Sequence, residues 1–201
     1  MYPVTFDAEF VEQRSRLTSF FRLIISIPWL IVSIFWGLGA VVCAVIAWFA
    51  IVFTGRYPQG LYDFVGKALR YNARVNAFQH LMTDRYPSFG GDEDPDYPVH
   101  LRIAPPLEHY SRVKTFFRVI LMIPVFILLY LMEILARAIG VLSWVVIVVT
   151  GRQPKGLFDV VKLVVAYQAR AGAYHLLVTE TYPPLTPEDS EPGYSSSVSP
   201  A

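Results

Sequence analysis

The sequence predicts an all-α integral membrane protein that consists of two tandem repeats. Three observations carry this prediction: two long apolar blocks, an internal duplication, and basic residues on both sides of each block. The chain is 54% hydrophobic and only 16% charged, whereas a soluble domain is about a quarter charged. The apolar blocks cover residues 23–53 and 119–149, well beyond the roughly 18 apolar residues that mark a transmembrane helix.

The duplication appears when the sequence is aligned with itself. Residues 15–87 match residues 111–183 without a gap, at roughly 30 of about 73 positions. The stretch TGRYPQGLYDF (residues 54–64) returns as TGRQPKGLFDV (residues 150–160). We therefore assign residues 1–88 to the first repeat, 89–96 to an acidic linker and 97–184 to the second repeat, and residues 185–201 have the composition of a disordered tail.

A short β-strand is expected at the start of each repeat. Apolar residues alternate after each Tyr-Pro-Val: Val4 and Phe6 in the first repeat, Val99, Leu101 and Ile103 in the second. This period of two is typical of a strand with one buried face. The two strands could pair with each other at the membrane surface.

Each apolar block is predicted to form a hairpin of two short helices, over about residues 18–53 and 114–149. A single helix over residues 20–53 would be about 50 Å long, against a hydrocarbon core of about 30 Å. Gly37 and Gly39 offer a place for the chain to reverse. Pro28 and Pro124 would kink the first helix of each hairpin. Whether the hairpins span the bilayer or are re-entrant is left open.

Basic residues precede and follow both apolar blocks. Because positive residues favour the cytoplasmic side, each block should leave and return to the same face. The interpretation is a multi-pass protein with both termini in the cytoplasm. The two units would insert in the same orientation, as parallel repeats about an axis along the membrane normal.

The repeated stretch is predicted to be a corner that leads into a second helix. Gly55 can close one helix in the left-handed conformation, and Pro58 prevents its continuation. The next helices, about residues 61–83 and 157–179, follow this corner. The first is amphipathic with a basic polar side, which is typical of a helix in the headgroup plane. The second is more apolar and is expected to be buried between elements or covered by a partner.

Charged residues at these corners and helix ends are the candidate contacts to anionic headgroups or to a partner protein. They are Arg22, Arg56, Asp63, Arg74, Arg118, Arg152, Asp159 and Arg170. The two corner arginines have two interpretations: they snorkel to headgroups, or they form ion pairs with the two aspartates or with a partner.

Glu133 and Arg137 are the candidate intramembrane polar pair. Spaced i, i+4, they can interact on one helix face. In one continuous helix they would lie at the membrane midplane, where ionisable groups are costly and usually functional. At a hairpin turn they would lie near water and be ordinary.

Catalytic and cofactor motifs are missing from the sequence. The four histidines have no metal-ligand spacing, and there is no nucleophile elbow, phosphate loop or dinucleotide fingerprint. The single cysteine, Cys43, excludes a disulfide framework, and no basic footprint for nucleic acid is visible. We expect no enzyme activity, no cofactor and no metal.

The TGRYPQGLYDF stretch, preceded by RLTSFFRLIISIPWLI and followed by YNARVNAFQHLMTDRYP, resembles a bacterial membrane family, frequent in actinobacteria, that is catalogued as domain of unknown function 4389. The resemblance covers both copies and implies a protein of the bacterial cytoplasmic membrane, without supplying an activity. The expected function is a non-catalytic accessory or scaffold subunit that binds lipid and docks on a larger membrane protein complex. The alternative is a small carrier or channel that uses the groove between the two hairpins.

Overall fold

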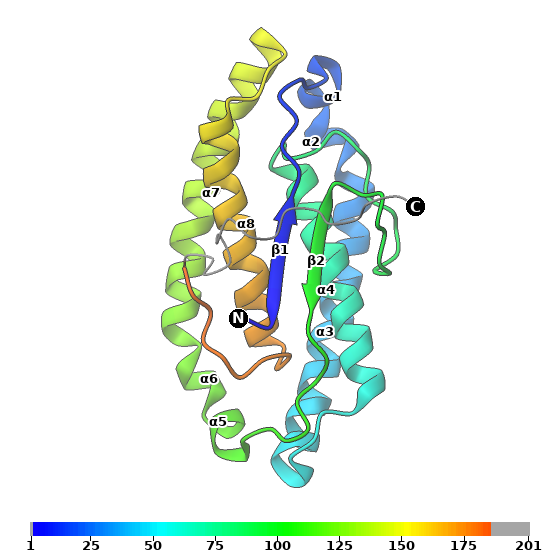
Figure 1. The fold of residues 1–201 in the computed structure, drawn as a ribbon, viewed down its shortest axis with the longest axis vertical. Coiled ribbons are helices and arrows are strands. Elements are labelled where there is room, and N and C mark those ends of the chain that lie inside the picture. The colour runs from blue at the N-terminus through cyan, green and yellow to red at the C-terminus, as the bar shows by residue number, and fades with distance from the viewer. Residues whose placement is uncertain (1, 186–201) are drawn as a thin grey trace, which may run out of the picture.

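The computed structural model describes residues 2–185. Each repeat has a strand, two short helices and two long helices in the same order (Figure 1). The first repeat contains β1 (Val4–Ala8), α1 (Arg16–Phe20), α2 (Arg22–Ile25), α3 (Ile27–Thr54) and α4 (Gln59–Gln79). The second contains β2 (Val99–Ile103), α5 (Arg112–Phe116), α6 (Arg118–Leu121), α7 (Ile123–Thr150) and α8 (Lys155–His175). Of the predicted tail, residues 186–201 lie outside the described residues.

The predicted hairpins are wrong, because each apolar block forms one continuous helix of 28 residues. The glycines do not turn the chain. A Cβ atom on Gly39 would lie 2.9 Å from the ring of Phe64, so this glycine allows α4 to pack closely on α3. The hairpin prediction assumed that an apolar helix can be no longer than the bilayer is thick. Nothing in the fold limits the length of the helices in this way. At 1.5 Å per residue each long helix is about 42 Å long.

Pro28 and Pro124 also have a different role from the one predicted. Each lies in the first turn of its long helix, where the missing N–H needs no partner, and so it begins the helix instead of kinking it. Ser15 and Ser111 cap the short helices that precede: their hydroxyls accept hydrogen bonds from the backbone N–H groups of Thr18 and Lys114.

The corner at the repeated stretch is confirmed. Gly55 and Gly151 both have φ of +74° and end α3 and α7. Thr54 Oγ1 accepts a hydrogen bond from the Arg56 N–H and donates to the Ala50 carbonyl oxygen at 2.6 Å. Pro58 directly precedes Gln59, the first residue of α4. The new helix thus begins two residues before the predicted start at residue 61.

The second long helix of each repeat is a core element, which corrects the prediction of two surface helices. α4 packs on α3 and β2, α8 packs on α7 and β1, and the two helices contact each other. Both are largely buried, with residues such as Val65, Phe78 and Val164 below 1% exposure. Only the expectation that α8 is buried between other elements is confirmed.

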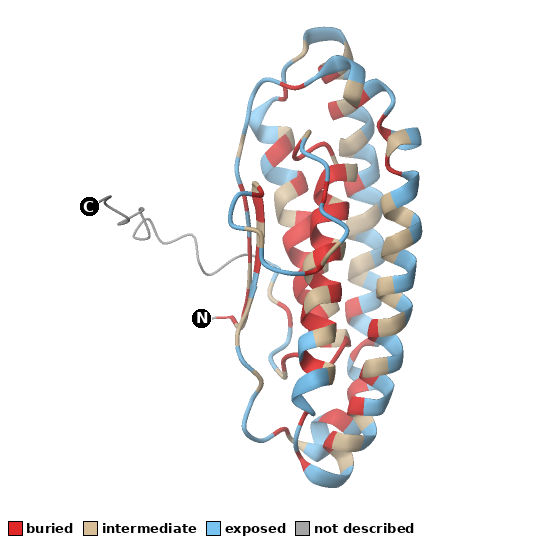
Figure 2. Ribbon diagram, turned by 90° about the vertical axis from the view of Figure 1, so that its right-hand side faces the viewer, coloured by how far each residue is buried: buried red, intermediate tan, exposed pale blue. Residues whose placement is uncertain are grey.

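The two strands pair in antiparallel fashion, as expected, with Phe6 opposite Leu101. Their alternate residues are buried against α4 and α8. The protein therefore has three layers: the sheet, the buried pair α4 and α8, and the outer pair α3 and α7 (Figure 2).

The two repeats run in opposite directions, and the predicted parallel arrangement is wrong (Figure 1). The end of α3 contacts α5, the first helix of the second repeat, and the end of α7 contacts α1. Trp48 Nε1 donates to the Thr115 carbonyl oxygen at 2.9 Å, and Trp144 Nε1 donates to that of Ser19 at 3.0 Å. A pseudo-twofold axis perpendicular to the long helices thus relates the repeats.

Candidate functional site: an apolar outer face and its buried arginines

The outer pair of helices, with the short helices that precede them, presents a broad apolar surface. Of the 40 exposed large hydrophobic residues in the described part of the chain, 33 lie within residues 16–54 and 112–150. Two segments, Ile27–Thr54 and Arg118–Thr150, are long and apolar enough to cross a membrane, and only 17% of the most apolar window of each is buried. We call this surface the α3/α7 face.

The α3/α7 face contrasts with the polar side that carries the sheet. Asp7 in β1 and Lys162 in α8 form an ion pair at 2.6 Å there, and Arg102 in β2 is exposed. Burial would raise the pKa of Asp7, but the hydrogen bond and charge of Lys162 outweigh it and hold the pKa below its usual range. We call this surface the sheet face. Local sequence patterns could not predict its ion pair, because the two partners are 155 residues apart.

A groove of about 350 Å³ opens between α3 and the short helix α6 that precedes α7. Val41, Val45 and Phe49 of α3 line one wall, and Val119 of α6 and Met122 line the other. His175 also lines the groove; burial, followed by the charge of Arg118, lowers its pKa, which favours the neutral ring. The groove therefore offers an apolar surface with few polar groups.

Arg22 and Arg118 point inward and do not face lipid, since each is only 3% exposed. Arg22 donates to the carbonyl oxygens of Phe78 and Thr83, and Arg118 donates to those of Tyr174 and Thr179 at 2.7 and 2.8 Å. These carbonyls belong to the turns that end α4 and α8. Each guanidinium thus stabilises a helix C-terminus, where a positive charge is favourable.

Each of those turns contains a residue with a strained backbone conformation, and the buried arginine helps to stabilise the turn. Leu81 and Leu177 both have φ of +64°, a conformation that costs a non-glycine residue about 1–2 kcal/mol. The Met82 N–H donates to the Ala77 carbonyl oxygen and the Leu81 N–H to that of Phe78, which is a Schellman motif. The same geometry in both copies makes it a property of the repeat.

The two buried arginines differ in their acidic partners. Asp84 Oδ1 pairs with Arg22 Nη2 at 2.5 Å. Glu180 occupies the equivalent position in the second copy, and it accepts a hydrogen bond from the Ser111 N–H at 2.5 Å. Among the described residues it forms no ion pair with Arg118 within 4.0 Å.

Arg74 and Arg170 are also buried, at 5% and 3% exposure. Arg74 donates to the Asp92 carbonyl oxygen at 2.5 Å and to Ser88 Oγ at 3.1 Å, so it fastens the acidic linker to α4. Arg170 donates to the Pro184 carbonyl oxygen at 3.4 Å. Both arginines therefore hold the chain that leaves their own repeat.

The acidic linker is complementary in charge to α4. Lys67 pairs with Asp92 at 2.7 Å and Arg70 with Glu93 at 3.2 Å. Gly91 lies so close to α4 that a Cβ atom there would be 2.1 Å from the Lys67 carbonyl oxygen. The basic side of α4 thus faces the linker.

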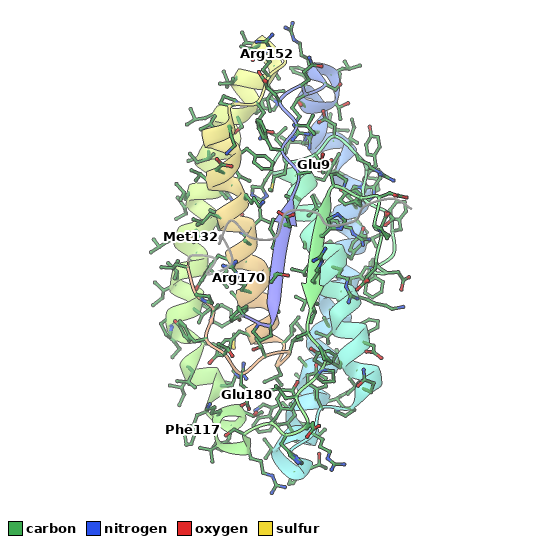
Figure 3. The ribbon with its side chains drawn as sticks, viewed as in Figure 1. Glu9, Phe117, Met132, Arg152, Arg170 and Glu180 are labelled. Carbon is green, nitrogen blue, oxygen red and sulfur yellow. The ribbon has the colours of Figure 1, made fainter. Side chains whose placement is uncertain are left out.

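The remaining charged corner residues, Arg56, Asp63, Arg152 and Asp159, are exposed. Figure 3 shows Arg152 at one end of the bundle. Asp63 accepts a hydrogen bond from Gln59, and Asp159 pairs with Lys155 at 3.1 Å. Arg152 approaches Glu12 at 3.9 Å. The predicted ion pairs of the corner arginines with these aspartates are not formed in the described part of the chain, which leaves Arg56 and Arg152 exposed.

The polar pair Glu133 and Arg137 is formed, with 2.8 Å between Glu133 Oε1 and Arg137 Nε. Gln168 of α8 donates to the other carboxylate oxygen at 2.8 Å. The pair lies in the middle of the continuous helix α7, so the interpretation that it lies at a hairpin turn is wrong. The Arg137 side chain is 76% exposed.

Sequence reasoning missed a polar junction between the repeats. Arg14 is 8% exposed and donates to Gln153 Oε1 at 3.0 Å and to the Met82 carbonyl oxygen at 2.6 Å. Tyr110 and Tyr57 take the two equivalent positions at the other junction, with their rings 5.9 Å apart. The sequence does contain a sign of this junction, because Gln153 stands where the first copy of the repeated stretch has a tyrosine.

The described residues contain no group of three or more His, Cys, Asp or Glu side chains that could hold a metal ion. A comparison with protein-family models matches residues 16–90 and 112–186 to a domain of unknown function (DUF4389). Searches among curated proteins and among solved structures find no match. The chain therefore belongs to the DUF4389 family and carries two tandem copies of its domain.

Proposed function

We propose that the protein is a non-catalytic integral membrane subunit of the bacterial cytoplasmic membrane, which binds lipid through the α3/α7 face and docks on a larger membrane protein complex. The observation that carries this proposal is the breadth of the α3/α7 face, which extends over both repeats. Exposed apolar patches of this extent mark interaction sites with membranes or proteins.

The energetic argument follows from burial. Fully burying a large apolar side chain stabilises by about 1.5–3 kcal/mol, so a half-exposed one contributes about 1 kcal/mol when it is covered. With 33 such residues on the face, transfer from water to hydrocarbon is favourable by a few tens of kcal/mol. A free monomer in water is therefore not a reasonable state for this fold.

Anionic headgroups fit the charges around the face. Arg16, Arg56, Arg112 and Arg152 are all exposed, and they lie at the ends of the helices that build it. Each such residue near an anionic surface contributes about 1 kcal/mol. We place the docking partner on the sheet face, because its charges of both signs suit a polar protein surface.

The test has two parts. Membranes are washed with alkaline carbonate, and the protein should stay with the lipid; release into the supernatant would contradict the membrane anchorage. The tagged protein is then purified in mild detergent, with Arg102→Glu as the variant and Glu108→Arg, at one end of the bundle, as the matched control. A stoichiometric membrane-protein partner that is lost only with the Arg102 variant supports docking, whereas recovery with lipid alone contradicts it.

A carrier or channel is the second candidate, and the position of the Glu133–Arg137 pair favours it. The pair lies in mid-helix and reaches α8 through Gln168, so it is a polar element next to the apolar outer face. The apolar lining of the groove between α3 and α6 supports the lipid-binding role instead. Loss of solute flux in vesicles with Glu133→Gln and Arg137→Gln would favour the carrier.

A further inference from the structure

We propose that the protein lies in the plane of the membrane, with the α3/α7 face in one leaflet and the sheet face in water, so that residues 2–185 do not cross the bilayer. The proposal rests on the membrane anchorage proposed above and gives it a geometry. Its occupant for the α3/α7 face is the headgroup and upper acyl region of a single leaflet, as for other in-plane amphipathic surfaces.

Polarity changes across the three layers, from the apolar outer helices through the buried α4 and α8 to the charged sheet face. Figure 2 shows the buried residues of the middle layer. The strands lie at mid-length of the bundle (Figure 1). A bundle that stood upright in the membrane would therefore place the sheet face at the depth of the hydrocarbon.

The charges on the sheet face and on the acidic linker make that upright orientation costly. Asp7 is 77% exposed at its side chain, Asp92 76% and Glu93 75%, and Arg102 is exposed as well. Ionisable groups inside a membrane normally face the protein interior or a water-filled cavity. In the in-plane orientation all of them face water.

Length also disfavours the upright orientation. The apolar segment Arg118–Thr150, which consists of α6 and α7 together, has 33 residues and extends about 50 Å, against a hydrocarbon core of about 30 Å. Helix tilt rarely exceeds about 40°, which still leaves the segment too long. A helix that lies in the membrane plane has no such limit on its length. The long apolar segments can therefore be continuous helices without a hairpin.

The basic residues at the two ends of the bundle are arranged symmetrically. The pseudo-twofold axis places Arg16 and Arg152 at one end of the bundle and Arg56 and Arg112 at the other. An upright bundle would have basic residues on both sides of the membrane, against the bias that orients membrane proteins. In the plane, all four lie at the headgroups of the same leaflet.

Cysteine accessibility in native membranes tests the orientation. The natural cysteine is removed by Cys43→Ala, and single cysteines are placed in water-facing positions: Glu108→Cys at one end, Lys155→Cys at the other and Arg102→Cys on the sheet face. Each variant is labelled with a membrane-impermeant maleimide in right-side-out and in inverted vesicles. All three positions are at the surface, so the fold should tolerate them.

The expected result is that Glu108→Cys and Lys155→Cys react from the same side, together with Arg102→Cys. Labelling of the two ends from opposite sides would overturn the proposal. If the ends react from one side and Arg102→Cys is protected, the orientation holds and the sheet face is covered by the docking partner.

A second measurement does not depend on the variants. Polarised infrared spectra of oriented bilayers should show the long helices parallel to the membrane plane, and helices along the membrane normal would contradict the proposal. The carbonate wash separates the two hypotheses. Release of the protein removes the membrane anchorage itself, whereas a carbonate-resistant protein with ends on opposite sides removes only the in-plane geometry.

Discussion

Asp84 and Glu180 occupy equivalent positions in the two copies, which makes them a matched pair for measuring the buried ion pair. Each carboxylate accepts a hydrogen bond from the backbone N–H of the serine that caps the first short helix of its own repeat: Ser15 for Asp84 and Ser111 for Glu180. In the part of the chain that the structure describes, Asp84 also forms an ion pair with a buried arginine, and Glu180 does not. The substitutions Asp84→Asn and Glu180→Gln both keep an oxygen acceptor for the serine N–H, so their difference isolates the ion pair.

The magnitude follows from the contact and its burial. A hydrogen bond to a charged partner contributes about 1.5–3 kcal/mol. The Arg22 side chain is 4% exposed and that of Asp84 is 25% exposed, so solvent screening is modest, and we expect a loss of about 2 kcal/mol for Asp84→Asn. Glu180→Gln should cost about 0.5 kcal/mol. For a chain of this size 1 kcal/mol shifts Tm by about 2–4 °C, so the expected shifts are about 4–8 °C and about 1–2 °C.

Thermal unfolding in one mild detergent, followed by far-UV circular dichroism, measures both shifts. Equal shifts for the two variants would refute the reasoning, since they would show that Arg22 contributes nothing beyond what the second copy has. An unchanged Tm for Asp84→Asn would refute it as well.

Three further predictions use the same assay. Gly91→Ala should lower the free energy of unfolding by about 1–3 kcal/mol, because its Cβ atom meets a backbone carbonyl of α4, whereas Gly90→Ala should change it by less than about 0.5 kcal/mol. Arg14→Tyr and Gln153→Tyr should each lower the free energy of unfolding by about 1–3 kcal/mol. The double variant should lose less than the sum of the two single losses, because it rebuilds the tyrosine pair of the other junction. A loss equal to that sum would contradict this prediction. Asp7 has a pKa below its usual range when folded, so its stabilising effect is present above the unfolded pKa and is lost as the pH falls through the folded value. The variant Lys162→Met removes the partner of Asp7 and should therefore lose less stability than the wild type when the pH is lowered. The same dependence of stability on pH in both proteins would contradict the assignment.

Local sequence signals predicted the repeat, the strands and the corner. Gly55 and Pro58 act through their own backbone preferences, and the alternation around Phe6 reflects one buried face. Such features depend on a few neighbouring residues, so one sequence is enough to find them. The pairing of β1 with β2 was considered because each repeat begins with such a strand, but its antiparallel direction was not predicted.

Features that depend on distant partners were not predicted correctly. The basic side of α4 suggested headgroups, but Lys67 and Arg70 pair with the acidic linker, and nothing in helical periodicity separates these two partners. The hairpins came from comparing helix length with bilayer thickness, a comparison that holds only for an upright helix. Arg22 and Arg118 were expected to contact headgroups or a partner, but they are buried. Their burial depends on turns that lie 56 and 61 residues away along the chain.

The antiparallel packing of the repeats has a consequence for a single copy. Each copy alone would have one unpaired strand edge, one uncovered side of its buried helix, and a tryptophan whose indole N–H has lost its acceptor in the other copy. The contacts that satisfy these groups are the same in both directions, so two identical copies could supply them to each other across a true twofold axis, as in an isologous dimer. The two repeats are thus arranged like the subunits of such a dimer, with the linker joining them. Because both copies are in one chain, residues such as Glu133 and Gln153 can be present in one copy and absent from the other, which is impossible in a dimer of identical subunits.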